Sequence, residues 1–351
     1  MTNKEYSVLS SFLMRSLFFG PAIYSVLHIA KQNGWISIIL SFILSFIPLI
    51  LYYLLFNLDK KKNIIDINND LGLLGKLFNL IFILFIIFHA SLVLWNLTNF
   101  IYSQFLFQTP LFIISLIFII GILYMSFKNI TSVARAGTIF FIINVILFLT
   151  AALSLIGKTD FSLLKPFLNE GLNPIFKGII PIIGLNVLPL FILLIFPKDN
   201  INGNVIKPFL KVYSFTYLAF FLIIVVCVSI LGINLTNLYQ YPEFHILKTI
   251  NIANFFQRVE SILSVQWIFD SVMSCALCVY FVKTNINETF NFKKNSFLNV
   301  ALVIIILIIT NFIFINNTVA LNFYMNFYPY ISIIVLFVLP TITYLLNLHN
   351  K

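Results

Sequence analysis

A few ionisable side chains lie inside the long apolar stretches of this sequence, and these are the residues that could do chemistry. Asp270 lies near the middle of one stretch, and Arg15 is the only basic residue deep within another. Because an ionised side chain is costly inside a bilayer, it normally faces the interior of a helix bundle and finds a partner there. One hypothesis pairs Arg15 with Asp270. The other has Arg15 extending its head group toward the cytoplasm while Asp270 is protonated.

The residues around Asp270 predict which face of its helix points inward. Polar and aromatic side chains recur there at steps of three or four residues, which places them on one helical face. We expect this face to point into the bundle; it consists of Ser264, Trp267, Asp270, Ser271, Ser274 and Cys278.

His89 is a further candidate, because histidine titrates near neutral pH and could relay protons. Asn96, Asn99 and Ser103 fall near the same helical stripe. The alternative is a histidine that is satisfied by packing alone. A single His without clustered partners gives no catalytic constellation, so we expect no enzyme active site.

The three cysteines, Cys227, Cys275 and Cys278, all lie in apolar stretches. Two thiols one turn apart without further ligands make a poor zinc site, and this placement does not suit a disulfide framework. We therefore expect packing roles for the cysteines, no metal and no cofactor.

The apolar helix that carries Arg15 cannot be regular through its middle. Pro21 lacks a backbone N–H and its ring crowds the carbonyl of Leu17, while Gly20 tolerates almost any backbone angle. In a bilayer, non-helical backbone survives only where other helices bury it or where it lines a polar cavity. The pattern favours a binding site at this break; the alternative is a harmless proline kink.

Composition identifies the class of protein. Of 351 residues, 61% are hydrophobic and 9% are charged, and the mean hydropathy is +1.04, which is far more apolar than a soluble core of this length could hide. We predict an all-α integral membrane protein that forms a single transmembrane domain over residues 1–351, with about ten spans and lipid around it. The predicted spans are 6–30, 35–56, 77–101, 110–127, 134–156, 174–196, 212–231, 262–282, 296–315 and 327–346.

Ten spans divide into two sets of five, about 6–156 and 174–346, and the second set then enters the membrane in the opposite orientation. Such inverted repeats are typical of transporters when corresponding helices are interrupted in both halves. Span six carries Pro181, Gly184 and Pro189, which matches the interruption in span one. The paired breaks predict a ligand cavity at Gly20, Pro21, Ala22, Gly184, Leu185 and Asn186.

The basic residues indicate the topology and not a nucleic-acid partner. With a cytoplasmic N-terminus, the inside segments hold fourteen of the 21 Lys and Arg, the outside segments hold six, and Arg15 lies within a span. This bias predicts that both termini are cytoplasmic. The two longest outside loops, 157–173 and 232–261, could form extracytoplasmic caps.

Several motifs of this sequence resemble those of a known protein family. They are GWIS at 34–37, TP at 109–110, ARAGTIFF at 134–141, FSLLKPFLNEGLNPIFKGIIP at 161–181 and YPEFHILKTINIANFFQRVESILSVQW at 241–267. With Gly20, they resemble the spore germination permease family, the B subunits of spore germinant receptors, within the amino acid/polyamine/organocation transporter superfamily. The resemblance covers nearly the whole chain, and the last two motifs are the most specific.

The resemblance implies a leucine-transporter-type fold with broken helices one and six and the ligand cavity at those breaks. It also implies a place in the spore inner membrane beside an A subunit and a lipoprotein C subunit, and a small germinant such as an amino acid. Where the family often has an acidic residue after the span-six glycine, this chain has Gly184, Leu185 and Asn186. Arg15 and Asp270 are not part of the resemblance.

Two functions remain open from the sequence. A receptor subunit would bind a germinant and shift a complex between states, whereas a proton-coupled amino acid permease would use the same fold and a coupling site such as Asp270 or His89. A membrane-embedded transferase would need a catalytic constellation that the sequence does not offer.

Overall fold

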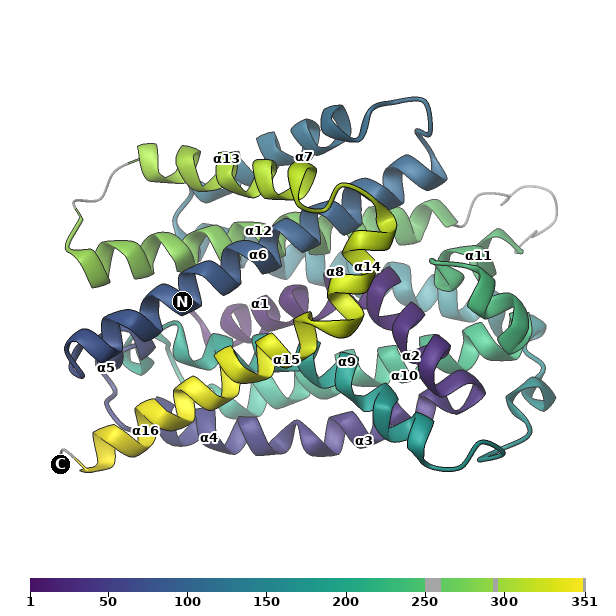
Figure 1. Cartoon of the computed structure of the whole chain (residues 1–351), viewed down its shortest axis with the longest axis horizontal. Helices are drawn as coiled ribbons and strands as arrows, with labels where there is room; N and C mark the ends of the chain where they lie inside the picture. The colour runs from purple at the N-terminus through teal and green to yellow at the C-terminus, as the bar shows by residue number, and fades with distance from the viewer. Residues whose placement is uncertain (250–259, 293–295, 350–351) are drawn as a thin grey trace.

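The computed structural model describes residues 1–249, 260–292 and 296–349, and over these residues the chain forms helices and no strand. The long helices lie alongside one another in a bundle (Figure 1). The all-α membrane fold predicted from composition is confirmed.

The first five predicted spans are all helical. Span one consists of α1 (Asn3–Arg15), a π-helical turn η1 (Phe18–Ala22) and α2 (Ile23–Ala30), and span two consists of α3 (Gly34–Leu44) and α4 (Phe46–Phe56). A short helix, α5 (Ile64–Asn69), leads into α6 (Leu73–Gln104), and α7 (Leu111–Ser126) and α8 (Ile130–Leu155) complete the set.

The second five predicted spans are helical as well. They are α9 (Asn173–Phe191), α10 (Ile206–Leu238), α12 (Glu260–Phe290), α13 (Phe297–Phe312) and a tenth span of α15 (Tyr328–Ile333), a π-helical turn η7 (Ile334–Val338) and α16 (Leu339–His349). The connecting helices α11 (Pro242–Lys248) and α14 (Asn317–Asn326) lie before spans eight and ten.

Length and hydropathy alone identify fewer spans. Within the described residues, seven helical segments are long and apolar enough to cross a membrane, or eight if the bent pair α13 and α14 counts as one. The predicted spans that fail the test are broken or short: α1 ends at the break, and α7 and α13 have 16 residues each.

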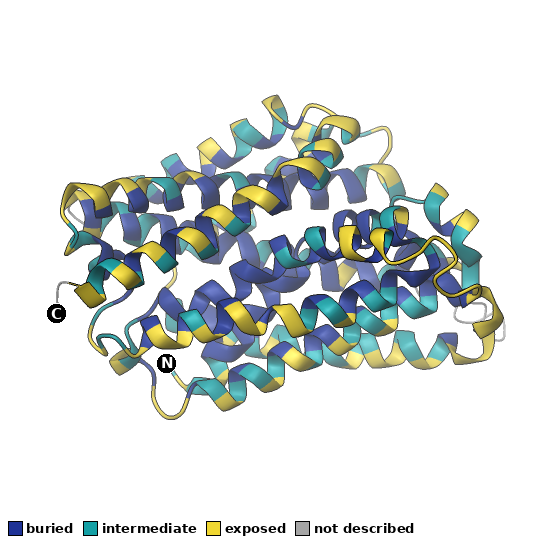
Figure 2. Cartoon of the chain, turned by 60° about the horizontal axis from the view of Figure 1, so that its bottom comes forward, coloured by how far each residue is buried: buried dark blue, intermediate teal, exposed yellow. Residues whose placement is uncertain are grey.

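The surface of the bundle is apolar, as a lipid environment requires. The inner faces of the helices are buried and their outer faces exposed (Figure 2). Large apolar side chains lie on those outer faces, including Ile43, Leu84, Ile120 and Ile146, each more than half exposed. In lipid such faces are stable, whereas in water they would drive association.

The break in span one is present. Phe19 has ψ 128° and Gly20 has φ 80° and ψ −94°, so the chain leaves the helical conformation for these two residues. A Cβ atom at Gly20 would lie 2.7 Å from Cε1 of Tyr241, so only glycine fits this position without a shift.

The break expected in span six is absent, which corrects that detail of the prediction. Helix α9 runs continuously from Asn173 to Phe191 through Pro181, Gly184 and Pro189, and only then tightens into a 3₁₀ turn at Ile192–Leu194. Gly184 allows close packing and does not break the helix. A Cβ atom there would lie 2.4 Å from the Cα of Pro329 on α15. The glycine therefore lets span ten approach span six.

The two ends of the bundle differ. At one end the chain termini lie near the inter-helix segments: Asn202 N–H donates to the Met1 carbonyl and Asp199 N–H donates to the Lys60 carbonyl, both at 3.1 Å. Helix α11 lies at the opposite end (Figure 1). The first expected cap contains the 3₁₀ turn η4 (Phe161–Leu164), and the second contains the end of α10, which runs on to Leu238, and then α11. Residues 250–259 of the second cap, and with them part of the motif at 241–267, lie outside the described residues.

Candidate functional site

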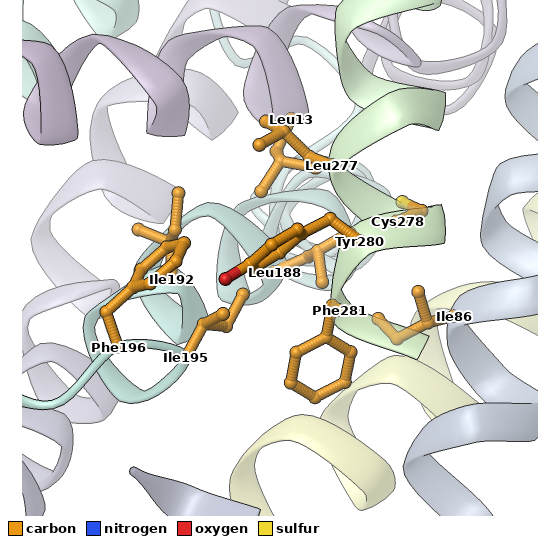
Figure 3. Close-up of a pocket in the computed structure, with 10 residues that line it drawn as sticks. All are labelled: Leu13, Ile86, Leu188, Ile192, Ile195, Phe196, Leu277, Cys278, Tyr280 and Phe281. Carbon is orange, nitrogen blue, oxygen red and sulfur yellow. The ribbon is translucent and has the colours of Figure 1, made fainter. Parts of the chain in front are cut away.

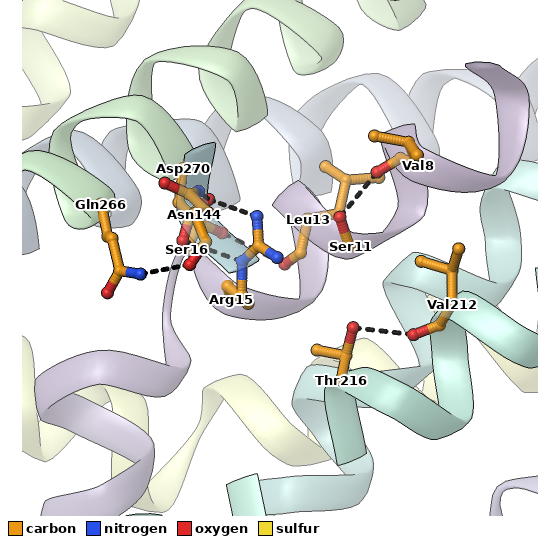
Figure 4. A network of polar contacts seen from close by, with 10 residues as sticks. All are labelled: Val8, Ser11, Leu13, Arg15, Ser16, Asn144, Val212, Thr216, Gln266 and Asp270. Atoms are coloured by element: carbon orange, nitrogen blue, oxygen red, sulfur yellow. Dashed lines mark hydrogen bonds and ion pairs between the residues drawn. The ribbon is translucent and has the colours of Figure 1, made fainter. Parts of the chain in front are cut away.

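Arg15 and Asp270 lie together in the interior of the bundle. The Arg15 guanidinium donates through Nε to Oδ2 of Asp270 at 2.9 Å and through Nη2 to Oδ1 at 2.6 Å (Figure 4). Both residues are buried, at 9% and 1% exposure. This two-pronged geometry is the strongest form of a carboxylate–guanidinium pair, and it joins α1 to α12.

Asn144 on α8 completes this polar cluster and was not singled out from the sequence. Its Nδ2 donates to Oδ1 of Asp270 at 2.8 Å, and its backbone carbonyl accepts a 2.6 Å hydrogen bond from Nε2 of Gln266. The guanidinium also lies 5.2 Å and 5.5 Å from the ring centres of Phe12 and Phe141. The charge on Arg15 is therefore compensated by a carboxylate and two aromatic faces.

The inward face predicted for span eight is confirmed. Its six side chains are all buried, from Trp267 and Ser274 at 0% to Ser264 at 7% exposure. Helix α12 thus presents a polar stripe to the interior although it is surrounded by apolar helices.

A cavity lies beside the pair, between the break in span one and helices α8, α10 and α12. Oδ1 of Asn144 is buried there, and no hydrogen-bond partner for it lies in the part of the chain that the structure describes. Such an orphaned acceptor indicates a place where a ligand or water could bind. The lining residues are Arg15, Phe19, Asn144, Val145, Phe148, Phe215, Thr216, Ala219, Phe220, Ile223, Gln266 and Asp270.

A second cavity adjoins the first, and Phe19, Phe148, Ile223 and Gln266 line both. It reaches Glu243 on α11, which the sequence did not single out because the residue lies in a predicted loop. Oε1 of Glu243 accepts the Gly20 N–H at 2.8 Å, so a carboxylate satisfies the backbone group that the break sets free. Oε2 is buried and has no hydrogen-bond partner within residues 1–249, 260–292 and 296–349. Burial raises the pKa of Glu243 to about 8.

The other backbone group at the break is also satisfied. Nδ2 of Asn96 donates to the Phe19 carbonyl at 3.0 Å, and Asn99 donates to the Tyr241 hydroxyl at 2.7 Å. The span-three stripe therefore supports the break, as Asn96 binds it directly and Asn99 holds the tyrosine that packs over Gly20. Trp267 stacks on Phe100 at 4.2 Å beside this tyrosine.

His89 lies away from this cluster. Its Nδ1 is 2.8 Å from the Tyr328 hydroxyl on α15, its Nε2 has no hydrogen-bond partner among the residues described, and the residue is fully buried. The structure therefore does not bring His89 together with Arg15 or Asp270, and a role in proton transfer stays a prediction.

The three span-six residues expected at the ligand pack against other helices. Gly184 lies against Pro329 and Ser332, Leu185 is fully buried, and Asn186 donates through Nδ2 to the Tyr217 hydroxyl. They hold span six to spans seven and ten.

A further cavity lies where α1, α6, α9 and α12 meet (Figure 3). Apart from the Tyr280 hydroxyl and the Cys278 thiol its walls are apolar, so no charged group there could orient a zwitterion. Its lining residues are Leu13, Ile86, Leu188, Ile192, Ile195, Phe196, Leu277, Cys278, Tyr280 and Phe281. Over the part of the chain that the structure describes, no three His, Cys, Asp or Glu side chains come together to hold a metal ion.

Comparison with solved structures supports the fold. A Na⁺-coupled sialic acid symporter in a substrate-bound outward-open state superposes with a TM-score of 0.60 at 12% identity, covering 95% of this chain and 79% of that one. A mutant of the manganese transporter of Eremococcus coleocola gives 0.58 at 14% identity, covering 98% and 78%. The leucine-transporter-type architecture is confirmed.

Comparison with known sequences identifies the family. The chain is 24% identical over 310 residues to spore germination protein KB of Bacillus subtilis (strain 168), covering 86% of this chain and 82% of that protein. It is 25% identical over 276 residues to spore germination protein YndE of the same organism, covering 76% and 74%. Because the profile of the spore germination protein (spore permease) family matches residues 8–319, the chain belongs to that family.

Proposed function

We propose that this chain is the membrane subunit of a spore germinant receptor, and that it binds a small germinant, an amino acid, at mid-membrane beside the break in span one. Family membership supports the germination role, and the transporter-type fold supports a ligand site inside the bundle. The proposal includes the spore inner membrane, cytoplasmic termini, an A subunit and a lipoprotein C subunit as partners.

The observation that carries the proposal is the environment of the break. Gly20 leaves the helical conformation, and a buried carboxylate from α11 accepts the Gly20 N–H at 2.8 Å. A cavity lined in part by Arg15, Asn144 and Asp270 lies next to it. A broken helix that is stabilised by side chains from other elements can change shape when a ligand replaces one of those contacts.

The residues predicted from the sequence take different parts in this proposal. Gly20 forms the break next to the ligand together with Phe19, and Pro21 and Ala22 follow it in η1. Gly184, Leu185 and Asn186 lie on α9, which packs against α1, the break and α2. There they hold span six to spans seven and ten, and their contribution to binding follows from that packing. Ligand binding would then move span one relative to a fixed span six, and this movement would signal that the ligand has bound.

A proton-coupled amino acid permease is the second candidate. The solved structures with the same fold are transporters, and Asp270 and His89 are buried ionisable side chains that a transport cycle could use. The Arg15–Asp270 pair argues for the receptor, because a carboxylate held by two hydrogen bonds and by Asn144 is not free to exchange a proton.

One pair of measurements separates these functions. The full-length chain in lipid nanodiscs is tested for equilibrium binding of a panel of radiolabelled amino acids, and the same chain in vesicles is tested for uptake under an inward proton gradient. Saturable binding without uptake supports the receptor. Uptake that a proton conductor abolishes supports the permease, and binding of no amino acid contradicts both.

A further inference from the structure

Glu243 has one carboxylate oxygen that the described part of the protein does not use. Oε1 accepts the Gly20 N–H, whereas Oε2 is buried without a hydrogen-bond partner among the described residues, and the residue is only 3% exposed. A buried, unpaired acceptor destabilises the folded protein, and it does so more strongly if it is charged. A group that offsets this loss by binding to Oε2 would therefore stabilise the site.

Glu243 lines a cavity whose other walls are apolar except at Gln266. Apart from Glu243, Gln266 is the polar side chain in the lining, and Phe19, Phe148, Leu222 and Leu263 are among the apolar ones. The wall is built from the break in span one and from α8, α10, α11 and α12. A single carboxylate at one side of an apolar cavity suits a molecule with one positive group and a hydrocarbon part.

We propose that this cavity binds the ammonium group of a small aliphatic amine or amino acid, with Oε2 of Glu243 as its counter-ion and the apolar wall around its hydrocarbon part. The inference rests on the proposed function, since it names the chemistry by which the germinant would be recognised.

The cavity favours an organic ammonium over an inorganic cation. Calcium takes six to eight oxygen ligands and magnesium takes six, whereas this lining supplies the carboxylate and the Gln266 amide. An ammonium group is satisfied by few acceptors when its hydrocarbon part fills the rest of the space. A carboxylate or phosphate ligand would be repelled by Glu243.

The proposed contact also reaches the break in span one. The carboxylate that would bind the ammonium group is the same one that accepts the Gly20 N–H. A ligand that keeps this carboxylate ionised strengthens the hydrogen bond to Gly20, because charge-assisted hydrogen bonds are the stronger ones. Ligand charge and the geometry of span one are thereby connected through one side chain.

The test compares isobutylamine with isobutanol, which have similar shapes and differ in charge. Binding of each to the full-length chain in nanodiscs is measured by titration calorimetry for wild type, Glu243→Gln and Glu170→Gln. The glutamine at 243 can still accept the Gly20 N–H, and Glu170 is an exposed control whose carboxylate pairs with Lys31. We expect Glu243→Gln to weaken isobutylamine binding about 10-fold to 100-fold and to leave isobutanol binding and the control unchanged.

Three results would overturn the inference: equal binding of amine and alcohol by wild type, unchanged amine binding by Glu243→Gln, or competition by sodium chloride that choline chloride at equal ionic strength does not reproduce. Thermal unfolding of each variant shows whether it is folded. Glu243→Asp keeps the charge but shortens the side chain, so it should bind the amine more tightly than Glu243→Gln.

If wild type binds amino acids and Glu243→Gln binds them equally well, the inference fails and the proposed function stands. If wild type binds no amino acid, the proposed function fails.

Discussion

At the level of single residues, Arg15 and Asp270 form a buried ion pair that joins span one to span eight. The contact is one of the two hypotheses that the sequence leaves open, and the two hydrogen bonds between the side chains decide in its favour. Asn144 and Glu243 could not be singled out from the sequence. An asparagine in an apolar helix is common, and Glu243 lies in a segment whose burial depends on how α11 folds back onto the bundle.

The pair leads to a stability prediction. Arg15→Gln and Asp270→Asn should each destabilise the protein by about 3 to 5 kcal/mol, because each leaves an uncompensated buried charge. The exchange Arg15→Asp with Asp270→Arg should recover part of the loss, and only part, since the Asn144 amide that donates to Asp270 would then face a cation. Unfolding in nanodiscs measures all three variants, and single variants as stable as wild type would refute a structural role for the pair.

Gly20 gives a second prediction at this scale. Gly20→Ala should destabilise the protein by about 1 to 3 kcal/mol from the positive φ alone, and further because its Cβ would meet the Tyr241 ring at 2.7 Å. Gly72→Ala is the matched control, because Gly72 has φ +66° with nothing within 4 Å of a Cβ. Comparison of the two unfolding midpoints separates backbone strain from the clash, and equal losses would show that the contact with Tyr241 does not matter.

Glu243 predicts a pH dependence whose sign follows from its raised pKa. Burial raises this pKa from 4.5 to about 8, so the folded protein without ligand holds a proton that the unfolded chain releases. The contribution of Glu243 protonation to the free energy of unfolding is therefore fully present below about pH 4.5. It falls as the pH rises through 8 and does not change further above that. Among the described residues, the titratable groups that interact with Glu243 electrostatically are the Tyr241 phenol and the Cys227 thiol.

The measurement is the thermal unfolding midpoint in nanodiscs between pH 5 and pH 9, for wild type and Glu243→Gln. The wild-type midpoint should fall over this range relative to that of the variant. Parallel profiles would mean that Glu243 does not titrate in this window.

At the scale of elements, span one and span six show what proline and glycine do and do not determine. Gly20 and Pro21 break span one because Gly20 has a positive φ and its freed groups bind Glu243 and Asn96. Pro181 and Pro189 leave α9 helical, since each removes one N–H without changing the backbone angles around it. The sequence could not distinguish these cases, because the difference depends on which side chains from other helices reach the backbone.

Gly184 gives a prediction at the level of helix packing. Gly184→Ala would place a Cβ 2.4 Å from the Cα of Pro329, so α9 and α15 must move apart, at a cost of about 1 to 3 kcal/mol. Gly121→Ala on α7 has nothing within 4 Å of the added atom and should leave stability unchanged or slightly raise it. If both variants unfold alike, close approach of spans six and ten contributes nothing.

At the scale of the whole molecule, ten spans could be predicted because apolar runs of spanning length alternate with short polar segments. What could not be predicted is how the ends pack, since α5 and α11 are short and take their positions from contacts with other parts of the chain. The bias of basic residues still predicts the orientation, with the terminal end of the bundle in the cytoplasm.

Orientation is tested by labelling single cysteines with a membrane-impermeant maleimide on intact cells. Asn234→Cys should react and Lys61→Cys should react only after the membrane is opened. The three native cysteines are buried and should give little background in wild type. The reverse pattern would overturn the topology.

Spores that carry Gly20→Leu show whether the break in span one belongs to the germinant site. A leucine at a positive φ beside Tyr241 should block the site while the other spans keep the protein in the membrane. The measurement is the germination response to increasing concentrations of the germinant, with immunoblotting of the spore inner membrane to show that the variant is present. We predict loss of the response at every concentration with the protein retained; a normal dose response with the protein retained would show that the break is not part of the germinant site.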